Sequence, residues 1–483
     1  MSAVTGASKV EATRRSQRSD RVVAAGLIAI TLVGAMISSL GAPLIPSIAR
    51  STGASLSNAQ WTLTITVLVS VAVTPVMGRL TDTRRRRSTI LIALALVTLG
   101  GVIAALNTSN LALLLLGRAL QGFGQGLAPM MIGIARAALA GRRQSSTISI
   151  LSITNAAGVG LGYPLTGLLD RAFGIAGAFL IGGALSSALA LIIAALVVPA
   201  NRTQSEPPVD IIGSVLFALS VGALLLALAQ GQTWGWSSAA VRVLFAAALV
   251  IGGAWVWQQL RSAHPLVELR LLRIRPVLTA DITVLLGGIG MYLLLTLTTR
   301  IVQAPANTGG LGHGAIIAGL AMLPLSAGSL AATWLARWLR HHLPGPVLLP
   351  TAALIMIVAM VLFAVSRHNL AGLLVTMAIA GVGIGLVFAL VPTLIVGHVP
   401  ESDTGSALSF NQIFRYVGYS LGSVLTATVL QAYTPAGNPY PSSHAYLAAS
   451  IAGAIVWTTA GLASLATYLT RHSRELVPQE AQP

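Results

Sequence analysis

The chain has 483 residues, of which 55% are hydrophobic and only 8% are charged, against roughly 25% charged residues in an ordinary soluble domain. A mean hydropathy of +0.82 means more apolar surface than a water-facing fold could bury, which excludes a soluble globular protein and a disordered chain. The 29 Lys and Arg residues outnumber the 12 Asp and Glu residues, and no Cys is present, so thiolate metal sites and disulfides are excluded.

Residues 1–21 are polar and basic, and we predict that they form a cytoplasmic tail. The apolar stretch that follows is too long for a signal-peptide core of about 7–15 residues, so it is predicted to be the first span. Fourteen such stretches approach the roughly 20 residues that a helix needs to cross hydrocarbon, which predicts an all-α polytopic membrane protein. The predicted spans are 22–46, 58–78, 89–107, 110–135, 146–169, 174–198, 211–230, 241–260, 277–302, 314–336, 347–366, 370–397, 405–431 and 446–470.

The basic residues cluster in alternate loops. Arg84 to Arg87, Arg142 with Arg143, and Arg273 with Arg275 all follow spans with even numbers, on the side of the N-terminal tail. Positive charge marks the cytoplasmic side, so both termini are expected in the cytoplasm and nucleic-acid binding is not expected. The bias toward Arg over Lys and the Ala and Gly content suggest a GC-rich bacterial genome, so a bacterial plasma membrane is the expected location.

Two sequence patterns recur at nearly the same offset. GFGQGL at 122–127 returns as GVGIGL at 381–386, and Ser149, Gly158 and Gly162 return 260 positions later as Ser409, Gly418 and Gly422. Spans one to six therefore correspond to spans nine to fourteen, with spans seven and eight inserted between the two halves. The predicted division is a tail at 1–21, a first half at 22–198, a linker with two inserted helices at 199–276, a second half at 277–470, and a cytoplasmic tail at 471–483.

Several motifs resemble those of the major facilitator superfamily, in its fourteen-helix branch of drug/proton antiporters. The motifs are GRLTDTRRRR at 78–87, RALQG at 118–122, Asp210 with Gly213, and PLVELRLLRIRP at 265–276. The resemblance implies a monomeric exporter of amphiphilic drugs, antibiotics or metabolites that works by alternating access and is coupled to protons. It implies no cofactor, and the sequence contains no evident metal site.

The loop after span two is predicted to hold a conformational latch. A lone Asp82 among Arg side chains can bind several guanidinium groups and lock one half of the bundle until they part. The alternative is that the Arg run only anchors the chain on anionic lipid headgroups. The predicted latch residues are Gly78, Asp82, Arg84, Arg86 and Arg87.

Span five has the composition of a hinge or a close helix contact. Small residues let helices approach and proline bends a helix, although small-residue packing alone is common in membranes. The predicted hinge residues are Gly158, Gly162, Pro164 and Gly167.

Two Arg residues fall inside predicted spans, where an unpaired guanidinium costs at least a few kcal/mol. If Arg118 in span four and Arg415 in span thirteen face one cavity, that cavity is electropositive and suits a neutral or anionic substrate. The alternative is that both are structural pins bound to backbone carbonyls. The predicted cavity residues are Arg118, Gln121, Gln125, Asn155, Asn411, Gln412, Arg415, Tyr416 and Tyr419.

The coupling group is less evident. By the resemblance, Ile37 stands where the family has an Asp in span one, and only Asp281 of the acidic residues lies inside a predicted span. Asp281 and Asp170 are therefore the candidate proton carriers, while a protonated substrate or an uncoupled facilitator remain alternatives.

Other protein classes have less support. The sequence carries neither a nucleophile paired with a base nor a P-loop, so we expect neither an enzyme nor an ATP-driven pump. A transport-dead sensor or assembly partner is the remaining alternative to an exporter.

Overall fold

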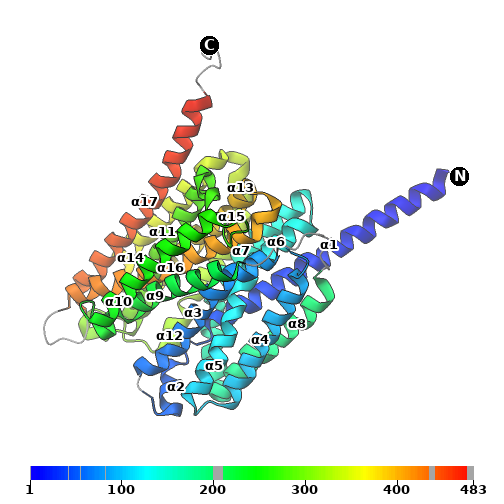
Figure 1. Cartoon of the computed structure of the whole chain (residues 1–483). Coiled ribbons are helices and arrows are strands. Elements are labelled where there is room, and N and C mark those ends of the chain that lie inside the picture. Colours follow the sequence, from blue (N-terminus) through cyan, green and yellow to red (C-terminus); the bar gives the residue numbers. More distant parts are fainter. Residues whose placement is uncertain are drawn as a thin grey trace.

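The structure is a computed structural model that describes residues 2–41, 43–54, 56–81, 83–198, 210–434 and 441–475. In these residues it is a bundle of long helices without strands, which confirms the predicted all-α class (Figure 1). Helices are expected in hydrocarbon because each satisfies its own backbone hydrogen bonds. The N-terminal elements are α1 (Ser2–Ser39), α2 (Ile45–Thr52), α3 (Leu56–Thr81), α4 (Arg86–Leu106), α5 (Leu111–Gln121), η1 (Gly122–Gly126), α6 (Leu127–Ala138), α7 (Gly141–Gly177), η2 (Ala178–Leu185) and α8 (Ser186–Val197).

The rest of the chain continues in the same manner, with two long helices before the second half begins at α11. The elements are α9 (Ile211–Trp234), α10 (Ala239–Arg261), η3 (Leu269–Arg273), α11 (Arg275–Gln303), η4 (Ala306–Thr308), α12 (Ala315–Leu320), α13 (Leu323–His342), η5 (Gly345–Val347), α14 (Leu348–Ser366), α15 (Leu370–Val396), η6 (Glu401–Asp403), α16 (Thr404–Ala432) and α17 (Ser443–Glu475).

The first span differs from its prediction at both ends. Helix α1 begins at Ser2, so most of the predicted tail is continuous with the span, and it ends at Ser39 rather than at residue 46. Pro43 follows in a turn, and a proline has no N–H for a helical hydrogen bond. The apolar run therefore divides into a span and the short helix α2.

One apolar stretch is twice the length of a span. The described residues contain 13 stretches long and apolar enough to cross a membrane, and the stretch Gly160–Val197 has 38 residues. Gly174 lies inside it with φ 68° and ψ −177°, a conformation that favours glycine and breaks the helix. A Cβ on Gly182 would lie only 3.3 Å from Leu169, whereas 13 residues of straight helix span about 20 Å. The chain therefore turns back at Gly174, and this stretch joins the end of the predicted span five to the predicted span six.

The helices form two lobes of six spans with the same pairing. In the first lobe α1 packs on α7 and α8, and α4 packs on α5 and α8. In the second lobe α11 packs on α16 and α17, and α14 packs on α15 and α17. The repeated sequence patterns therefore lie on helices with equivalent neighbours, while the boundaries of the predicted division stay a prediction.

The inserted helices α9 and α10 pair with each other, and α9 lies against α3 and α16, one helix from each lobe (Figure 1). Near their ends Asp210 accepts hydrogen bonds from Gln258 at 3.0 Å. Within the bundle Trp255 of α10 lies 5.0 Å from Phe217 of α9 and 6.1 Å from Phe410 of α16, between ring centroids. The pair is thus packed on the edge of the contact between the lobes.

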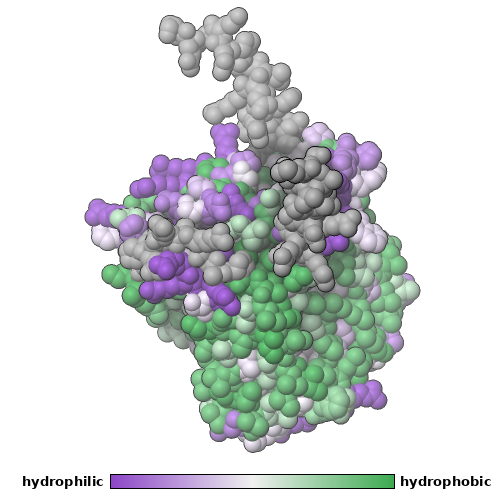
Figure 2. Space-filling view, turned by 90° about the vertical axis from the view of Figure 1, so that its right-hand side faces the viewer, coloured by the Kyte–Doolittle hydropathy of each residue, from purple (hydrophilic) through white to green (hydrophobic). Residues whose placement is uncertain are grey.

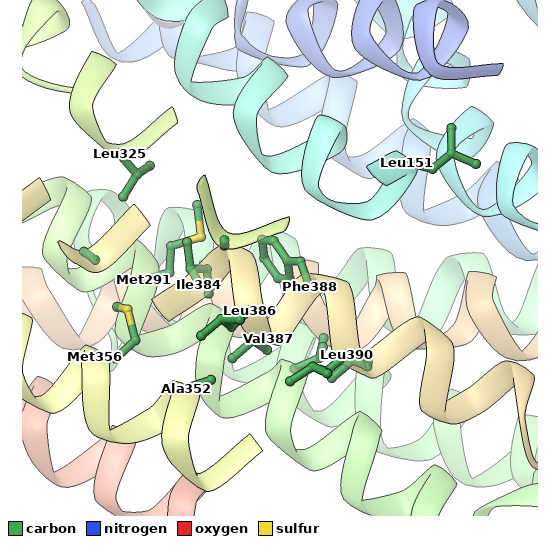
Figure 3. Close-up of a cluster of buried hydrophobic side chains, with 14 of the residues drawn as sticks. Leu151, Met291, Leu325, Ala352, Met356, Ile384, Leu386, Val387, Phe388 and Leu390 are labelled. Atoms are coloured by element: carbon green, nitrogen blue, oxygen red, sulfur yellow. The ribbon is translucent and has the colours of Figure 1, made fainter. Parts of the chain in front are cut away.

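The surface and the core both match a membrane protein. Figure 2 shows one face of the molecule as a broad hydrophobic area with hydrophilic residues gathered mostly at one end. Leu196 is 81% exposed and Leu249 is 78% exposed, which is favourable only against lipid. The buried core of the second lobe is built around α15, whose Ile384 and Leu390 lie among side chains of neighbouring helices (Figure 3). The chain therefore spans a membrane.

Candidate functional site

A small polar hollow lies where α6 and α7 of the first lobe meet α15 and α16 of the second. It has room for about one water molecule. The residues that surround it include no Asp or Glu, and five of them are polar or basic. The lining consists of Ala128, Pro129, Ile132, Ser152, Asn155, Pro392, Leu408, Asn411, Gln412 and Arg415.

Arg415 is the one charged residue of this lining. Its side chain is only 5% exposed, and its guanidinium carbon lies 4.2 Å from the ring centroid of Phe388, in a cation–π contact. Figure 3 shows Phe388 leaving α15 on the side opposite to Leu390. Nε of Arg415 has no hydrogen-bond partner, and no carboxylate among the described residues forms an ion pair with it. A buried cation thus keeps unused hydrogen-bonding capacity beside the hollow.

Asp281 does not line the hollow itself but contacts a residue that does. It is 2% exposed on α11, and its Oδ1 accepts a 2.7 Å hydrogen bond from Nδ2 of Asn411, which lines the hollow. No Arg, Lys or His in the described part of the chain lies within ion-pair distance of Asp281. An isolated carboxylate is costly at such a place, so a change in its proton occupancy would be felt through Asn411.

Tyrosines lie beside Gln412 of the hollow, but none of them, including the predicted cavity residues Tyr416 and Tyr419, belongs to its lining. Nε2 of Gln412 donates to the hydroxyl of Tyr416 at 2.8 Å, and the Tyr416 ring lies 6.3 Å from that of Tyr419. The Tyr419 ring lies 5.8 Å from that of Tyr292 on α11. Tyr163 lies on α7 of the opposite lobe, one turn after Gly160, where a Cβ would meet the side chain of Ser326 on α13 of the second lobe.

Arg118 does not share this hollow. It is fully buried on α5, where Nε donates to the carbonyl of Thr62 at 3.2 Å and Nη1 donates to Ile37 at 3.4 Å and to Gln121 at 2.6 Å. These contacts match the alternative stated for Arg118, in which its guanidinium is a structural pin that bonds backbone carbonyls and joins α1, α3 and α5. The backbone of Ile37 supplies one acceptor where the resemblance places an Asp side chain. Gln125 is half-buried in η1 and does not line the hollow either.

The lobes are joined across one end of the bundle by Arg79, which the sequence placed beside Asp82 in the predicted latch, and by Arg136, which it did not single out. Arg79 of α3 forms a 3.2 Å ion pair with Asp403 of the second lobe. Arg136 of α6 donates to the carbonyls of Val399 at 2.9 Å and Pro400 at 3.4 Å, and to the hydroxyl of Thr404. We call this set of contacts the interlobe clasp.

The predicted latch residues have mixed surroundings. Gly78 lies in the contact between the lobes, because a Cβ there would be 2.7 Å from the carbonyl of Gly405. Arg84 is exposed and Arg86 is buried, while Arg87 donates to the carbonyl of Ala195 at 2.6 Å within its own lobe. Asp82 lies outside the described residues, so its role as a latch stays a prediction.

The predicted hinge residues lie mostly in close helix contacts. A Cβ on Gly158 would lie 2.6 Å from Ala35 of α1, and one on Gly162 would lie 2.8 Å from Ser39 of α1. Pro164 is inside α7, and Gly167 has open space around it. On the second lobe a Cβ on Gly418 would lie 2.4 Å from the carbonyl of Leu285 on α11, and Gly422 contacts α11 in the same way.

Asp170, the other candidate for coupling, lies at the far end of α7. Its Oδ2 accepts a 2.8 Å hydrogen bond from Ser47 of α2, and Arg50 donates to Ser47 at 3.2 Å. This arrangement ties α2 to α7 and has no described link to the hollow.

The clasp and the tyrosines Tyr163 and Tyr292 were missed by sequence reasoning. Arg79 and Asp403 are 324 positions apart, and nothing in their local sequence relates them. Arg136 looked like one more positive charge of an inner loop. The repeat could have pointed to Tyr163, because it aligns near the tyrosines of α16 at the offset of 260.

Two six-helix lobes that enclose a polar hollow inside a lipid-facing shell define a membrane transporter, and nothing in the site has the arrangement of a catalytic centre. The sequence profile described as Major Facilitator Superfamily matches residues 27–423. The chain therefore belongs to the major facilitator superfamily.

Relatives of the chain include a multidrug resistance protein and an antibiotic export protein. It is 27% identical over 400 residues to the multidrug resistance protein Stp of Mycobacterium tuberculosis, covering 81% of this chain and 72% of Stp. It is 26% identical over 457 residues to the cephamycin export protein CmcT of Amycolatopsis lactamdurans, covering 92% of each chain. Among solved structures it resembles the human organic anion transporter MFSD10 with a TM-score of 0.66 and 14% identity, covering 92% of this chain and 99% of that one. The last match supports the fold alone.

Proposed function

We propose that this transporter exports neutral or anionic amphiphilic small molecules from the bacterial cytoplasm by alternating access, in exchange for protons. The observation that carries the proposal is Arg415, a buried cation that forms no ion pair with any described residue and lines a hollow whose lining has no carboxylate. Such a site attracts an anion or the electron-rich end of a neutral molecule and repels a cation. The name of CmcT, a cephamycin export protein, supports export of small molecules as the general activity, and the name of Stp, a multidrug resistance protein, is consistent with it.

The direction of access follows from the clasp. The end of the bundle that carries Arg79 and Arg136 also carries the Arg-rich loops, and we take it as the cytoplasmic end with both termini on that side. With the clasp formed, the hollow is closed toward the cytoplasm. Substrate enters after the clasp opens, and rocking of the lobes then carries the site to the other side.

Asp281 is the better candidate for proton coupling. Its carboxyl contacts Asn411, which lines the hollow, so loading of the hollow and protonation of Asp281 can influence each other. Asp170 has no such connection and holds α2 instead.

The substrate preference is tested by transport into proteoliposomes with a panel of acids, neutral alcohols and amines of one carbon skeleton. We expect Arg415→Gln to lower uptake of the acids at least tenfold and to leave the neutral compounds much less changed. The matched control is Arg242→Gln, an exposed Arg at the start of α10. Equal transport of amines and acids by the unmodified protein would overturn the proposed preference.

Coupling is tested with Asp281→Asn and the control Asp170→Asn. An imposed pH gradient should drive uptake by the unmodified protein and by the control, whereas Asp281→Asn should retain substrate exchange but lose the response to the gradient. Indifference of the unmodified protein to the gradient would identify an uncoupled facilitator. Absence of both uptake and exchange for every compound would favour a sensor or assembly partner.

A further inference from the structure

We infer that the preferred substrates are planar aromatic acids, whose anionic end binds Arg415 and whose rings lie against the tyrosines of both lobes. This inference rests on the proposed function and deepens it. Arg415 selects the charge of the substrate, whereas the tyrosines next to it select the part of the substrate that carries no charge.

The guanidinium group of Arg415 has a fixed orientation. One side of Arg415 is covered by the Phe388 ring at 4.2 Å, so its position is set before a ligand arrives. Its unpartnered Nε leaves hydrogen-bonding capacity for a carboxylate, and Arg binds carboxylates through paired N–H groups. Asn411 and Gln412 of the same helix have their amides engaged with Asp281 and Tyr416, which leaves Arg415 as the main anion-binding group of the hollow.

A group of tyrosine rings lies beside Arg415. Tyr416 directly follows Arg415 along α16, and the ring of Tyr419 lies next to that of Tyr292, with centroids 5.8 Å apart and planes tilted by 30°. Along α16, Tyr419 follows Arg415 by one helical turn, further from the clasp. A ligand whose charged end is at Arg415 therefore has aromatic side chains along its length.

The hydroxyl groups of three of these tyrosines offer further contacts to a ligand. Tyr163, Tyr292 and Tyr419 are half-buried, and in the part of the chain that the structure describes none of the three hydroxyls forms a hydrogen bond. None of the three hydroxyls is among the fully buried polar atoms without a partner, so each reaches accessible space and can form a hydrogen bond with a ligand. Tyr163 belongs to the first lobe and Tyr292 with Tyr419 to the second, so a ligand between them would contact both moving bodies.

Aromatic rings favour other rings over saturated groups of equal size, because their quadrupoles attract in tilted and offset arrangements. The expected effect of one such pair on a dissociation constant is about 2- to 12-fold. An acyl chain or a saturated ring would bind here by burial of apolar surface alone and would lack this gain in affinity.

The experiment measures binding to the purified protein in nanodiscs by isothermal titration calorimetry, so that it does not depend on transport or on protons. The probes are 1-naphthoate, its fully saturated decahydronaphthalene acid, and neutral 1-naphthalenemethanol. We expect 1-naphthoate to bind at least fivefold more tightly than the saturated acid. Tyr419→Phe should keep this ratio within about twofold, whereas Tyr419→Leu should reduce it toward one, and the same pair of changes at Tyr163 checks the other lobe.

The possible failures are distinguishable. If the saturated acid binds as tightly as 1-naphthoate, or if Tyr419→Phe loses as much as Tyr419→Leu, the aromatic inference is wrong while the preference for anions stands. If 1-naphthoate binds no better than the neutral alcohol, the inference that acids are preferred is wrong, while the proposed transport of neutral or anionic molecules stands. If Arg415→Gln binds 1-naphthoate as tightly as the unmodified protein does, the proposed function loses Arg415 as the source of its charge preference. Absence of measurable binding of 1-naphthoate would overturn the inference itself.

Discussion

The interlobe clasp allows a graded prediction about the conformational equilibrium. Arg136 donates to three oxygen atoms of the other lobe, and all of these bonds must break when the lobes part at that end. A hydrogen bond to a charged group contributes about 1.5–3 kcal/mol, and because Arg136 is partly exposed we take about 1.5 kcal/mol for the whole set. Arg136→Gln should therefore shift the population toward the state open at the clasp by about tenfold.

Arg79 should have a smaller effect. Its ion pair with Asp403 has side chains 14% and 24% exposed, and such pairs contribute about 0–1 kcal/mol. Arg79→Gln should shift the same equilibrium by about twofold. Arg87→Gln is the matched control, because Arg87 bonds only within its own lobe among the contacts described, and it should leave the equilibrium unchanged.

The assay is single-molecule fluorescence transfer between dyes on cysteines introduced at Ala140 and His398, two exposed positions on opposite lobes near the clasp. The chain has no native Cys, so only these two positions react. We expect the low-transfer population to increase in the order Arg87→Gln, Arg79→Gln, Arg136→Gln. An unchanged ratio of the two populations in Arg136→Gln would refute the assignment of the clasp.

Two further predictions concern stability. Gly418→Ala places a Cβ 2.4 Å from the carbonyl of Leu285, so it should destabilise the protein by about 1–3 kcal/mol and lower its melting temperature. Gly167→Ala is the control, because its Cβ meets open space, and equal melting temperatures of the two variants would contradict the close contact of α11 and α16. Arg118→Met should also lower the melting temperature, because the buried carbonyls of Ile37 and Thr62 lose a donor at about 1–3 kcal/mol each. A variant as stable as the unmodified protein would show that Arg118 is not a pin.

The sequence by itself determined the class of this protein. Hydropathy and helix length are local properties, so runs of apolar residues predict spans without knowledge of their neighbours. The repeat of Gly158 and Gly162 as Gly418 and Gly422 likewise predicted two equivalent halves, because a close helix contact demands glycine wherever it occurs. The same reasoning found Arg415, since a charge inside a span is conspicuous against its surroundings.

Only the tertiary structure decided which polar groups act together. Arg118 and Arg415 look alike in sequence, yet one is bonded to backbone carbonyls inside a lobe and the other lines a hollow between lobes. The partners of Asp281 and of the clasp lie more than a hundred residues away along the chain. Their pairing depends on how helices are rotated and placed against each other, which is set by the packing of many small contacts rather than by any local pattern.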